Sequence, residues 1–288
     1  MERMHGGTRV YGIIGWPVAH SRSPQMHNAA FRALGMDALY LPFAVPPERL
    51  REAVAGLRVL GVAGWNVTIP HKTAVMPLLD ELSPEAVRAG AVNTVLQREG
   101  RLIGHNTDGV GLLTALQRDL ACPVAGARIV VLGAGGAARG AVAAFAGAGA
   151  GQVTVVNRTP ASAELLVRDL QVGLPPGWLQ AATTDELPRL LPAVDLLVNA
   201  TSVGLKGERH DDLALALLPE AAKVYDMVYG PVATPLVAEA RRRGLAASNG
   251  LGMLVAQGEE AFRYWTGLLP PLGVMAAAAA AGVGAPNP

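Results

Sequence analysis

Short apolar runs alternate with longer amphipathic stretches along most of the chain. The clearest run covers residues 129–132, is rich in β-branched side chains, and is typical of a parallel strand buried on both faces. It leads through a glycine-rich turn into an alanine-rich stretch that we expect to be helical. Strands that alternate with helices in this way predict right-handed parallel units and an α/β fold.

The spacing of apolar residues along the chain predicts the other strands and helices. We expect strands at residues 10–15, 38–45, 62–69, 91–97, 102–104, 153–156, 179–182, 194–199, 224–228 and 246–248. Helices are expected at residues 23–34, 47–60, 109–120, 161–170, 235–243 and 252–266, with one more from about residue 71 that Pro77 interrupts. Ser23 precedes Pro24, which favours Ser23 as the N-cap of its helix. Residues 98–100 predict a turn between two strands.

Composition and charge limit the functional classes to which this chain can belong. The 288 residues are enough for two domains, and a formal net charge of +1 gives no sign of a nucleic-acid or membrane surface. Cys122 is the one cysteine, which excludes an internal disulfide and favours a reducing cytoplasm. No His, Cys, Asp or Glu cluster has metal-ligand spacing, so we expect no metal. Residues 1–9 do not resemble a signal peptide, and the apolar runs are too short for a membrane span.

The turn after residues 129–132 predicts a dinucleotide site. Gly133 permits a tight turn, Gly135 lets the backbone approach a pyrophosphate, and Ala138 is the third small residue of this fingerprint. The helix that follows presents free N–H groups and the positive end of its dipole to the anion.

The next strand ends in Asn157-Arg158-Thr159, where an acidic residue would normally hold the ribose hydroxyls. A carboxylate would repel a 2′-phosphate, whereas Arg158 can pair with it and Thr159 can donate a hydrogen bond. The plain alternative is a polar strand end without a ligand.

Residues 66–72 hold a second candidate for chemistry. Strand alternation places Asn66 and Thr68 on one face. Lys72 is expected in the first turn of the following helix, where the dipole disfavours its charge and suits it to proton transfer. A solvated surface lysine is the ordinary alternative.

Other polar residues have both a structural and a functional interpretation. Asp108 is foremost an N-cap candidate, and Ser21 and Ser23 are also candidates to bind a carboxylate at a helix N-terminus. Asn93 interrupts an apolar strand and needs hydrogen-bond partners, whether ligand or backbone. Gln257 borders the apolar stripe of the last long helix, where an ordinary boundary residue is the alternative.

Together, these segments resemble the shikimate dehydrogenase family over nearly the whole chain. The matching strings, in the family's order, are residues 21–24, 66–72, 89–94, 106–109, 133–137, 157–159, 199–204, 226–229 and 249–257. Two departures concern the cofactor: many members carry a basic residue where this chain has Ser162, and Pro160 alters the same loop. Pro84 stands where some members have an acidic residue, so no ligand role is assigned there.

The resemblance implies a role for each matching residue. It makes Lys72 the catalytic lysine and Asp108 its partner. It implies that Ser21, Ser23 and Tyr229 hold the substrate carboxylate, and that Thr68, Asn93 and Gln257, with Lys72 and Asp108, contact the ring oxygens. It also implies that Gly133, Ala134, Gly135, Gly136 and Ala137 cradle the pyrophosphate, that Asn157, Arg158 and Thr159 hold the 2′-phosphate, and that Met227 and Gly250 lie near the nicotinamide.

The family pattern also implies a substrate-binding domain at 1–112, completed by C-terminal helices at 249–288, and an NADP-binding Rossmann domain at 113–248. The implied reaction is the NADPH-dependent, reversible reduction of 3-dehydroshikimate to shikimate, in chorismate and aromatic amino-acid biosynthesis, by a cytoplasmic monomer or homodimer. A quinate or dual quinate/shikimate dehydrogenase that uses NAD is one alternative. A nucleotide- or metabolite-sensing protein is another, disfavoured by Lys72 and Asp108. A folate-type dehydrogenase is the third, and the paired serines and the Gln257 segment argue against it.

Overall fold

The computed structural model describes residues 4–230 and 233–281. The chain divides into two compact units: the first comprises Met1–Thr107 and Val255–Pro288, and the second comprises Asp108–Leu254. The expected domain boundary after residue 112 lies inside the helix Asp108–Leu120, whereas the two units divide at the first residue of that helix. The expected boundary after residue 248 lies inside the strand Ala246–Asn249, whereas the units divide after Leu254, within the helix Leu251–Thr266. Residues 1–3, 231–232 and 282–288 of the predicted domains lie outside the described residues.

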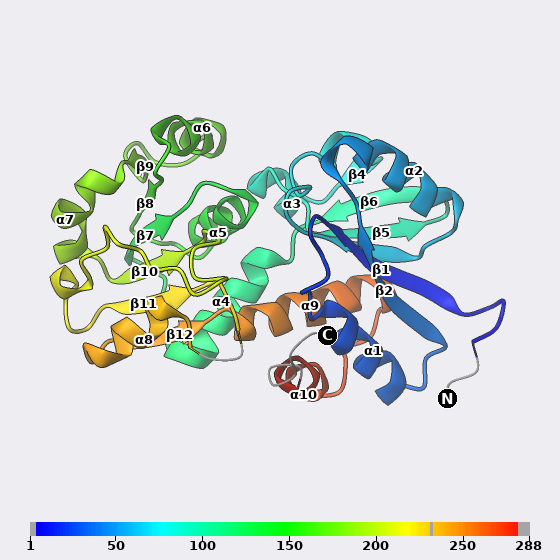
Figure 1. The fold of residues 1–288 in the computed structure, drawn as a ribbon. Coiled ribbons are helices and arrows are strands. Elements are labelled where there is room, and N and C mark those ends of the chain that lie inside the picture. The colour runs from blue at the N-terminus through cyan, green and yellow to red at the C-terminus, as the bar shows by residue number, and fades with distance from the viewer. Residues whose placement is uncertain (1–3, 231–232, 282–288) are drawn as a thin grey trace. The chain divides into compact units, whose positions relative to one another are not determined.

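The first unit contains a six-stranded mixed sheet in the order β2-β1-β3-β5-β6-β4 (Figure 1). Its strands are β1 (Arg9–Gly15), β2 (Ala38–Ala44), β3 (Gly64–Val67), β4 (Glu81–Leu82), β5 (Thr94–Arg98) and β6 (Arg101–His105). β1 runs parallel to β2 and β3, while β5 is antiparallel to both β3 and β6. The predicted turn between β5 and β6 is confirmed, with positive φ at Glu99 and Gly100.

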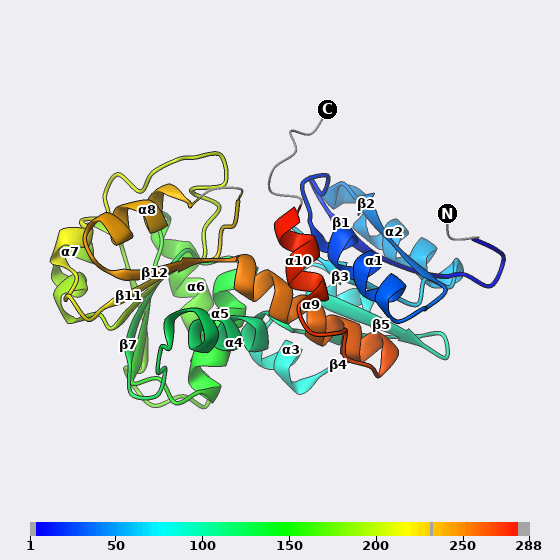
Figure 2. The same cartoon turned by 90° about the horizontal axis from the view of Figure 1, so that it is seen from below.

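Helices cover both faces of this sheet. They are α1 (Ser23–Ala33), α2 (Leu50–Val59), α3 (Pro84–Ala89), α9 (Leu251–Thr266) and α10 (Val274–Ala281), with 3-10 turns at Pro47–Arg49 and Met76–Leu78. Trp65 and Val67 of β3 pack into a cluster with α2. On the opposite face, the ring of Tyr11 lies 5.1 Å from that of Phe31 and 5.4 Å from that of Trp265. In Figure 2, α1 and α10 lie side by side next to this sheet's strands.

Two local predictions for this unit are wrong. The segment from residue 71 forms turns and a short 3-10 helix rather than an α-helix. Pro77 cannot donate a helical hydrogen bond, and the ring of His71 is held by a 2.7 Å contact between its Nε2 and the carbonyl of Val45. Ser23 is the first helical residue and Arg22 occupies the N-cap position. The strand β4 and the helix α3 were not expected from the sequence.

The second unit is an all-parallel sheet in the order β12-β11-β10-β7-β8-β9. Its strands are β7 (Arg128–Leu132), β8 (Gln152–Val156), β9 (Leu179–Ala182), β10 (Leu196–Asn199), β11 (Lys223–Asp226) and β12 (Ala246–Asn249). Its helices include α4 (Asp108–Leu120), α5 (Gly136–Gly147), α6 (Pro160–Leu170), α7 (Leu187–Leu190) and α8 (Pro235–Arg242). Renumbered from β7, this is the doubly wound order 3-2-1-4-5-6, so the predicted Rossmann-like fold is confirmed.

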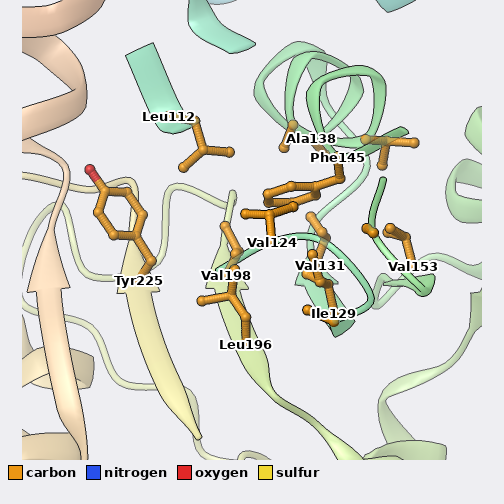
Figure 3. Close-up of a cluster of buried hydrophobic side chains, with 14 of the residues drawn as sticks. Leu112, Val124, Ile129, Val131, Ala138, Phe145, Val153, Leu196, Val198 and Tyr225 are labelled. Atoms are coloured by element: carbon orange, nitrogen blue, oxygen red, sulfur yellow. The ribbon is translucent and has the colours of Figure 1, made fainter. Parts of the chain in front are cut away.

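β7 shows why this sheet needs helices on both sides. Ile129 and Val131 pack into a cluster with α4, α5 and α6, whose centre includes the fully buried Phe145 (Figure 3). Val130 and Leu132 point to the other face and pack with α7 and α8. The continuous apolar run therefore supplies two cores at once. Among the described residues, no helix is long and apolar enough to cross a membrane.

Candidate active site

The strand directions of the first unit bring its polar residues to one edge of the sheet. Parallel β1 and β3 end at this edge, and antiparallel β5 begins there, so that Asn66 of β3 is paired with Thr94 of β5. Asn93 immediately precedes β5, and β6 ends at this edge because Thr94 also pairs with His105. Asn66, Thr94 and His105 come from distant parts of the chain and are therefore brought onto neighbouring strands by sheet register alone.

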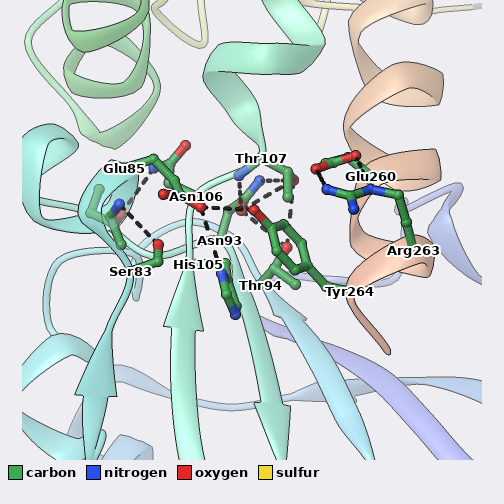
Figure 4. Close-up of polar contacts among 12 residues, drawn as sticks. Ser83, Glu85, Asn93, Thr94, His105, Asn106, Thr107, Glu260, Arg263 and Tyr264 are labelled. Carbon is green, nitrogen blue, oxygen red and sulfur yellow. Dashed lines mark hydrogen bonds and ion pairs between the residues drawn. The ribbon is translucent and has the colours of Figure 1, made fainter. Parts of the chain in front are cut away.

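Asn93 is the centre of a buried hydrogen-bond network at this edge (Figure 4). Its Oδ1 accepts from the backbone N–H of Thr107 at 2.8 Å and from the hydroxyl of Thr94 at 3.1 Å. Its Nδ2 donates to the Thr107 hydroxyl at 2.9 Å and to Oε1 of Gln257 at 3.5 Å. Two predicted substrate residues, Asn93 and Gln257, are thus brought together although they are far apart in the sequence.

Three contacts hold the C-terminal end of α9, the helix that carries Gln257. The indole Nε1 of Trp265 donates to the carbonyl of Val95 at 2.9 Å. The hydroxyl of Tyr264 donates to Oε1 of Glu85 at 2.8 Å, and its ring stacks on that of His105 at 3.9 Å. Burial opposes ionisation of Glu85, but the Tyr264 hydrogen bond is among the contacts that hold the pKa of this carboxyl below its usual value.

The two predicted carboxylate-binding serines lie where β1 leads into α1. Ser23 is buried at the start of α1, and its backbone N–H donates to the hydroxyl of Ser21 at 3.3 Å. Ser21 therefore supplies the oxygen that meets the start of this helix, which explains why Ser23 is not the N-cap. Both hydroxyls lie at a helix N-terminus, a position that suits an anion.

Thr68 and Lys72 follow the end of β3. The N–H of Thr68 donates to the carbonyl of Ile14 at 2.9 Å, which continues the ladder between β1 and β3. The carbonyl of Lys72 accepts from the N–H of Val92 at 2.8 Å. This bond places the Lys72 backbone beside the segment that carries Asn93. Because no α-helix begins at Lys72, the dipole argument for this residue does not hold.

The glycine turn of the second unit fits a pyrophosphate. Gly133 has φ +104°, and a Cβ there would lie 2.9 Å from Cγ2 of Thr201, so the backbone needs glycine at this point. A Cβ at Gly135 would have no described atom within 4 Å, which leaves its outer side open to a ligand. Gly136 and Ala137 begin α5, and Ala134 links the two glycines. Ala138 is fully buried, as the third small position requires.

Asn157, Arg158 and Thr159 lie between β8 and α6. The Nδ2 of Asn157 donates to the carbonyl of Thr159 at 3.0 Å, which folds the segment into a tight turn. Arg158 and Thr159 are exposed, and Thr159 is the N-cap residue of α6. An exposed guanidinium beside a helix N-terminus is suited to a phosphate group.

Met227 and Gly250 are in contact at the ends of β11 and β12. A Cβ at Gly250 would overlap the carbonyl of Met227, and the N–H of Gly250 donates to the carbonyl of Val228 at 3.1 Å. The loop is ordered by Asp226, which accepts from the N–H of Val228 at 3.0 Å and from Nδ2 of Asn199 at 2.8 Å. Burial raises the pKa of Asp226 in spite of these bonds.

Tyr229 is half-buried in the loop after β11, and Asp108 is buried as the first residue of α4. Both belong to the second unit, whereas Lys72 and the serines belong to the first. The Lys72–Asp108 pair and the grouping of Tyr229 with the serines therefore stay predictions.

Sequence interpretation missed several polar residues of the first unit's sheet edge. Thr94 and Thr107 complete the hydrogen bonds of Asn93, and both are fully buried. Glu85 and Tyr264 hold α9 in place. A polar residue next to an already suspected one was a usable signal for Thr94 and Thr107. No pattern in the sequence links Glu85 to Tyr264, since only the fold brings them together.

Three family models match successive parts of this chain. The model described as shikimate dehydrogenase substrate binding domain matches residues 13–95, that of shikimate / quinate 5-dehydrogenase matches 115–212, and that of the shikimate 5′-dehydrogenase C-terminal domain matches 250–280. A shikimate dehydrogenase (NADP(+)) of Geobacter sp. (strain M21) is 53% identical over 285 residues, which cover 98% of each chain. The chain belongs to the shikimate dehydrogenase family. The resemblance drawn from its motifs is thereby confirmed.

Two solved structures are similar to this chain over nearly its full length. Shikimate 5-dehydrogenase of Thermus thermophilus, in complex with NADP(H) and shikimate, has a TM-score of 0.83 at 42% identity, covering 94% of this chain and 98% of that one. Quinate dehydrogenase of Corynebacterium glutamicum, in complex with NAD, has a TM-score of 0.86 at 29% identity, covering 94% of this chain and 98% of that one.

Proposed function

We infer that this protein is an NADP-dependent shikimate dehydrogenase that reversibly reduces 3-dehydroshikimate to shikimate. The observation that carries the inference is the 53% identity to a shikimate dehydrogenase (NADP(+)) over 98% of both chains. This match includes the polar sheet edge of the first unit and the glycine turn of the second. The reaction serves the biosynthesis of chorismate and of the aromatic amino acids.

Shikimate is a carboxylate with three ring hydroxyls, and the predicted substrate residues suit both groups. The hydroxyls of Ser21 and Ser23, with that of Tyr229, are assigned to the carboxylate. Thr68, Asn93 and Gln257 are assigned to the ring oxygens. Because Asn93 and Gln257 are already held by the network of the sheet edge, they need little reordering when a ligand binds.

Proton transfer is assigned to Lys72, with Asp108 as the residue that orients it. NADPH, when bound, supplies the hydride that reduces the substrate carbonyl. The developing alkoxide needs a proton, and the Lys72 ammonium is a donor of three N–H bonds on a flexible stem. The bond between its carbonyl and the N–H of Val92 holds the lysine backbone near Asn93, which is assigned to the same ring.

The cofactor assignment depends on residues of the second unit. Gly133, Ala134, Gly135, Gly136 and Ala137 would hold the pyrophosphate, Asn157, Arg158 and Thr159 the 2′-phosphate, and Met227 and Gly250 the nicotinamide. The open side of Gly135 and the exposed Arg158 fit this arrangement. Ser162 lacks the positive charge that many members have at this position, so Arg158 carries most of the expected preference for NADP.

One spectrophotometric experiment tests the function. Absorbance at 340 nm is followed with the purified protein and each pairing of shikimate or quinate with NADP or NAD. We expect the highest kcat/KM for shikimate with NADP. Faster turnover of quinate with NAD would establish the alternative dehydrogenase, and no turnover in any pairing would leave a nucleotide- or metabolite-sensing protein.

We also propose a cytoplasmic monomer or homodimer that needs no nucleic-acid or membrane partner, in keeping with one cysteine and a net charge of +1.

A further inference from the structure

The strand order of the second unit's sheet reverses between β7 and β10. From this pair, strands are added outward through β8 and β9 on one side and through β11 and β12 on the other. Ligands of such sheets bind outside the carboxyl ends of the strands at this switch point. Asn199, the last residue of β10, is paired with Leu132, and the N–H of Ala200 donates to the carbonyl of Leu132 at 2.8 Å. Asn199 therefore lies next to the glycine turn that begins with Gly133.

The amide of Asn199 is fully buried and has one possible orientation. Its Nδ2 donates to the carbonyl of Val203 at 3.1 Å and to Oδ1 of Asp226 at 2.8 Å. A backbone carbonyl can only accept, so the amide nitrogen is fixed on this side and Oδ1 on the other. This Oδ1 accepts from the N–H and the hydroxyl of Thr201, at 3.0 and 2.7 Å. The Thr201 hydroxyl accepts in turn from the N–H of Val203 at 3.1 Å, which closes a compact turn after β10.

Asp226, the last residue of β11, is paired with Asn199 on the neighbouring strand and is fully buried. Its Oδ1 accepts from Asn199 and from the N–H of Val228 at 3.0 Å, and its Oδ2 accepts from the hydroxyl of Thr234 at 2.5 Å. The Thr234 hydroxyl accepts from the N–H of Val237, so its own proton is available for Asp226. A buried carboxylate is unfavourable unless hydrogen bonds replace the lost water, and these three donors replace it. The side chain therefore fixes the segments that supply the donors relative to one another.

The Asn199–Asp226 pair sets the backbone on both sides of the switch point. On one side, the turn that Asn199 closes lies against the glycine turn, because a Cβ at Gly133 would be 3.1 Å from the carbonyl oxygen of Ala200. On the other side, the N–H of Met227 donates to the carbonyl of Asn199 at 2.9 Å. Gly133 is assigned to the pyrophosphate and Met227 to the nicotinamide. The pair thus connects these two assigned contacts through buried hydrogen bonds.

We propose that Asn199 and Asp226 are positioning residues for hydride transfer. They hold the segment at Met227 in one place relative to the glycine turn, so that the nicotinamide is aligned once the pyrophosphate is bound. The 2′-phosphate is assigned to Arg158, which follows β8 rather than β10 or β11, so binding of the adenosine half should not depend on the pair. This inference rests on the proposed function, because it takes Met227 and the glycine turn as cofactor contacts.

Asp226→Ala removes both acceptor oxygens and tests the alignment. Single-turnover stopped-flow measurements follow the oxidation of NADPH by 3-dehydroshikimate. We expect the rate constant to fall by about 10- to 100-fold, since a small displacement of reacting groups has effects of this size. The amplitude is expected to stay the same, whereas a protein that had only partly unfolded would lose amplitude and keep its rate constant.

Binding of adenosine 2′,5′-bisphosphate, which lacks the nicotinamide, separates alignment from general cofactor binding. Its dissociation constant, measured by calorimetric titration, is expected to be the same for Asp226→Ala and the unaltered protein. Asp226→Asn keeps an acceptor oxygen for the donors of Asn199 and Val228, and is expected to retain the rate constant to within about 3-fold.

Trp178→Phe is the matched control. It removes a buried hydrogen bond, from Nε1 of Trp178 to the carbonyl of Ala150 at 2.6 Å, at the opposite edge of the same sheet, where β8 and β9 begin. It should lower stability in urea without changing the rate constant. An unchanged rate constant in Asp226→Ala, an equal loss in Trp178→Phe, or a loss of bisphosphate affinity as large as the loss of rate would overturn the proposal.

Amide exchange in the unaltered protein covers the case in which Asp226→Ala does not fold. The N–H groups of Thr201 and Val228 donate to the pair, and NMR is expected to show both protected from exchange before any cofactor is added. Rapid exchange that ceases only with NADP would show that the cofactor creates this arrangement, and would contradict the inference. If the unaltered protein turns over no pairing of substrate and cofactor, the proposed function itself has failed; if it is active and only these results are negative, this inference alone has failed.

Discussion

Substitutions of single side chains are expected to change stability or activity most at the polar sheet edge and in the glycine turn of the second unit, where the fold offers few other hydrogen-bond partners. The network around Asn93 satisfies buried donors and acceptors in one arrangement, and an amide that loses a partner there has no water to replace it. Lys72 is partly exposed and Arg158 is exposed, as side chains that must meet a ligand should be. Substitutions at these two kinds of position should therefore separate stability from activity.

Lys72→Ala tests the proton-transfer assignment. We expect kcat for shikimate oxidation to fall by about 10²-fold or more, with little change in the affinity for NADPH, because the residue acts on the substrate rather than the cofactor. Steady-state kinetics and NADPH fluorescence titration measure the two quantities. Near-normal turnover in this variant would remove Lys72 from the mechanism.

Arg158→Ala tests the cofactor preference. Loss of the guanidinium is expected to raise KM for NADP by about 10- to 100-fold while changing KM for NAD little, since only NADP carries the 2′-phosphate. The ratio of kcat/KM for NADP to that for NAD is the measured quantity. Arg168→Ala, on the exposed part of α6, is the control. An unchanged ratio would assign the preference to other groups.

His27→Phe tests the cost of a buried imidazole. Burial lowers the pKa of His27 to about 3, with an interaction from Asn66 opposing the shift. The unfolded chain takes up this proton below its ordinary pKa of about 6.5, whereas the folded protein does not until about 3, so stability falls as pH drops through this window. The loss between pH 7 and pH 4 is on the order of 3 kcal/mol.

The phenylalanine variant should lose part of this acid sensitivity. Its melting temperature is expected to fall less than that of the unaltered protein between pH 7 and pH 4, measured by circular dichroism. His20→Gln, at an exposed position, serves as control and should follow the unaltered curve. Parallel curves for His27→Phe and the unaltered protein would contradict the assignment.

At the scale of the element, the position of α9 depends on a glycine in β3, where the strand has no side chain. Gly64 opens β3, and the indole of Trp265 lies directly against its Cα, where a Cβ would overlap Cδ1 and Nε1 of the ring. The same indole donates to the carbonyl of Val95 on the neighbouring strand. The absence of a side chain at Gly64 therefore lets α9 approach closely enough for Gln257 to reach Asn93.

Gly64→Ala tests this packing against Gly56→Ala. The first substitution should destabilise the protein by about 1–3 kcal/mol, because a methyl group is forced against an immobile indole. The second lies in the interior of α2, where a Cβ has no described neighbour within 4 Å, and should stabilise by about 0.5–1 kcal/mol. Urea unfolding gives both values, and equal effects at the two sites would show that the Trp265 contact does not constrain β3.

At the scale of the whole molecule, the first unit is built from both ends of the chain while the second is continuous. The second unit has its own two cores, one on each face of its sheet. The first unit depends on Phe262 and Trp265, which are buried and belong to the C-terminal segment. Their rings contact those of Phe31 and Tyr11, contributed by the N-terminal segment.

A chain truncated after Leu254 tests this dependence. The second unit is expected to fold and to retain binding of NADPH, whereas the first should lose its cooperative unfolding transition and all binding of shikimate. The reason is that truncation would expose the aromatic face of this unit to water. Each Å² of apolar surface that is no longer buried costs about 25 cal/mol of folding free energy. Calorimetry and titration with each ligand measure the outcome, and retained shikimate binding would contradict it.

Local pattern determined much of this protein. The strand at residues 129–132 follows from a continuous run of apolar, β-branched residues, the glycine turn from backbone freedom at glycine, and the long helix with Gln257 from a period of 3.6 residues. All of these are properties of neighbouring residues. The exact motif strings also identified the family. The helix expected after residue 71 failed because the contact of His71 with Val45 and the end of β3 outweighed local preference.

Tertiary structure alone decided which polar residues share a site. Tyr40, Asn66 and Thr94 come from β2, β3 and β5, and β1, which precedes all three in the chain, lies between β2 and β3 in the sheet. Hydrogen bonds act over about 3 Å and depend on direction, so they form only once strand register and helix position are set. Chain order carries no such information about the bonds from Asn93 to Gln257 or from Tyr264 to Glu85, which exist because the two ends of the chain fold into one unit.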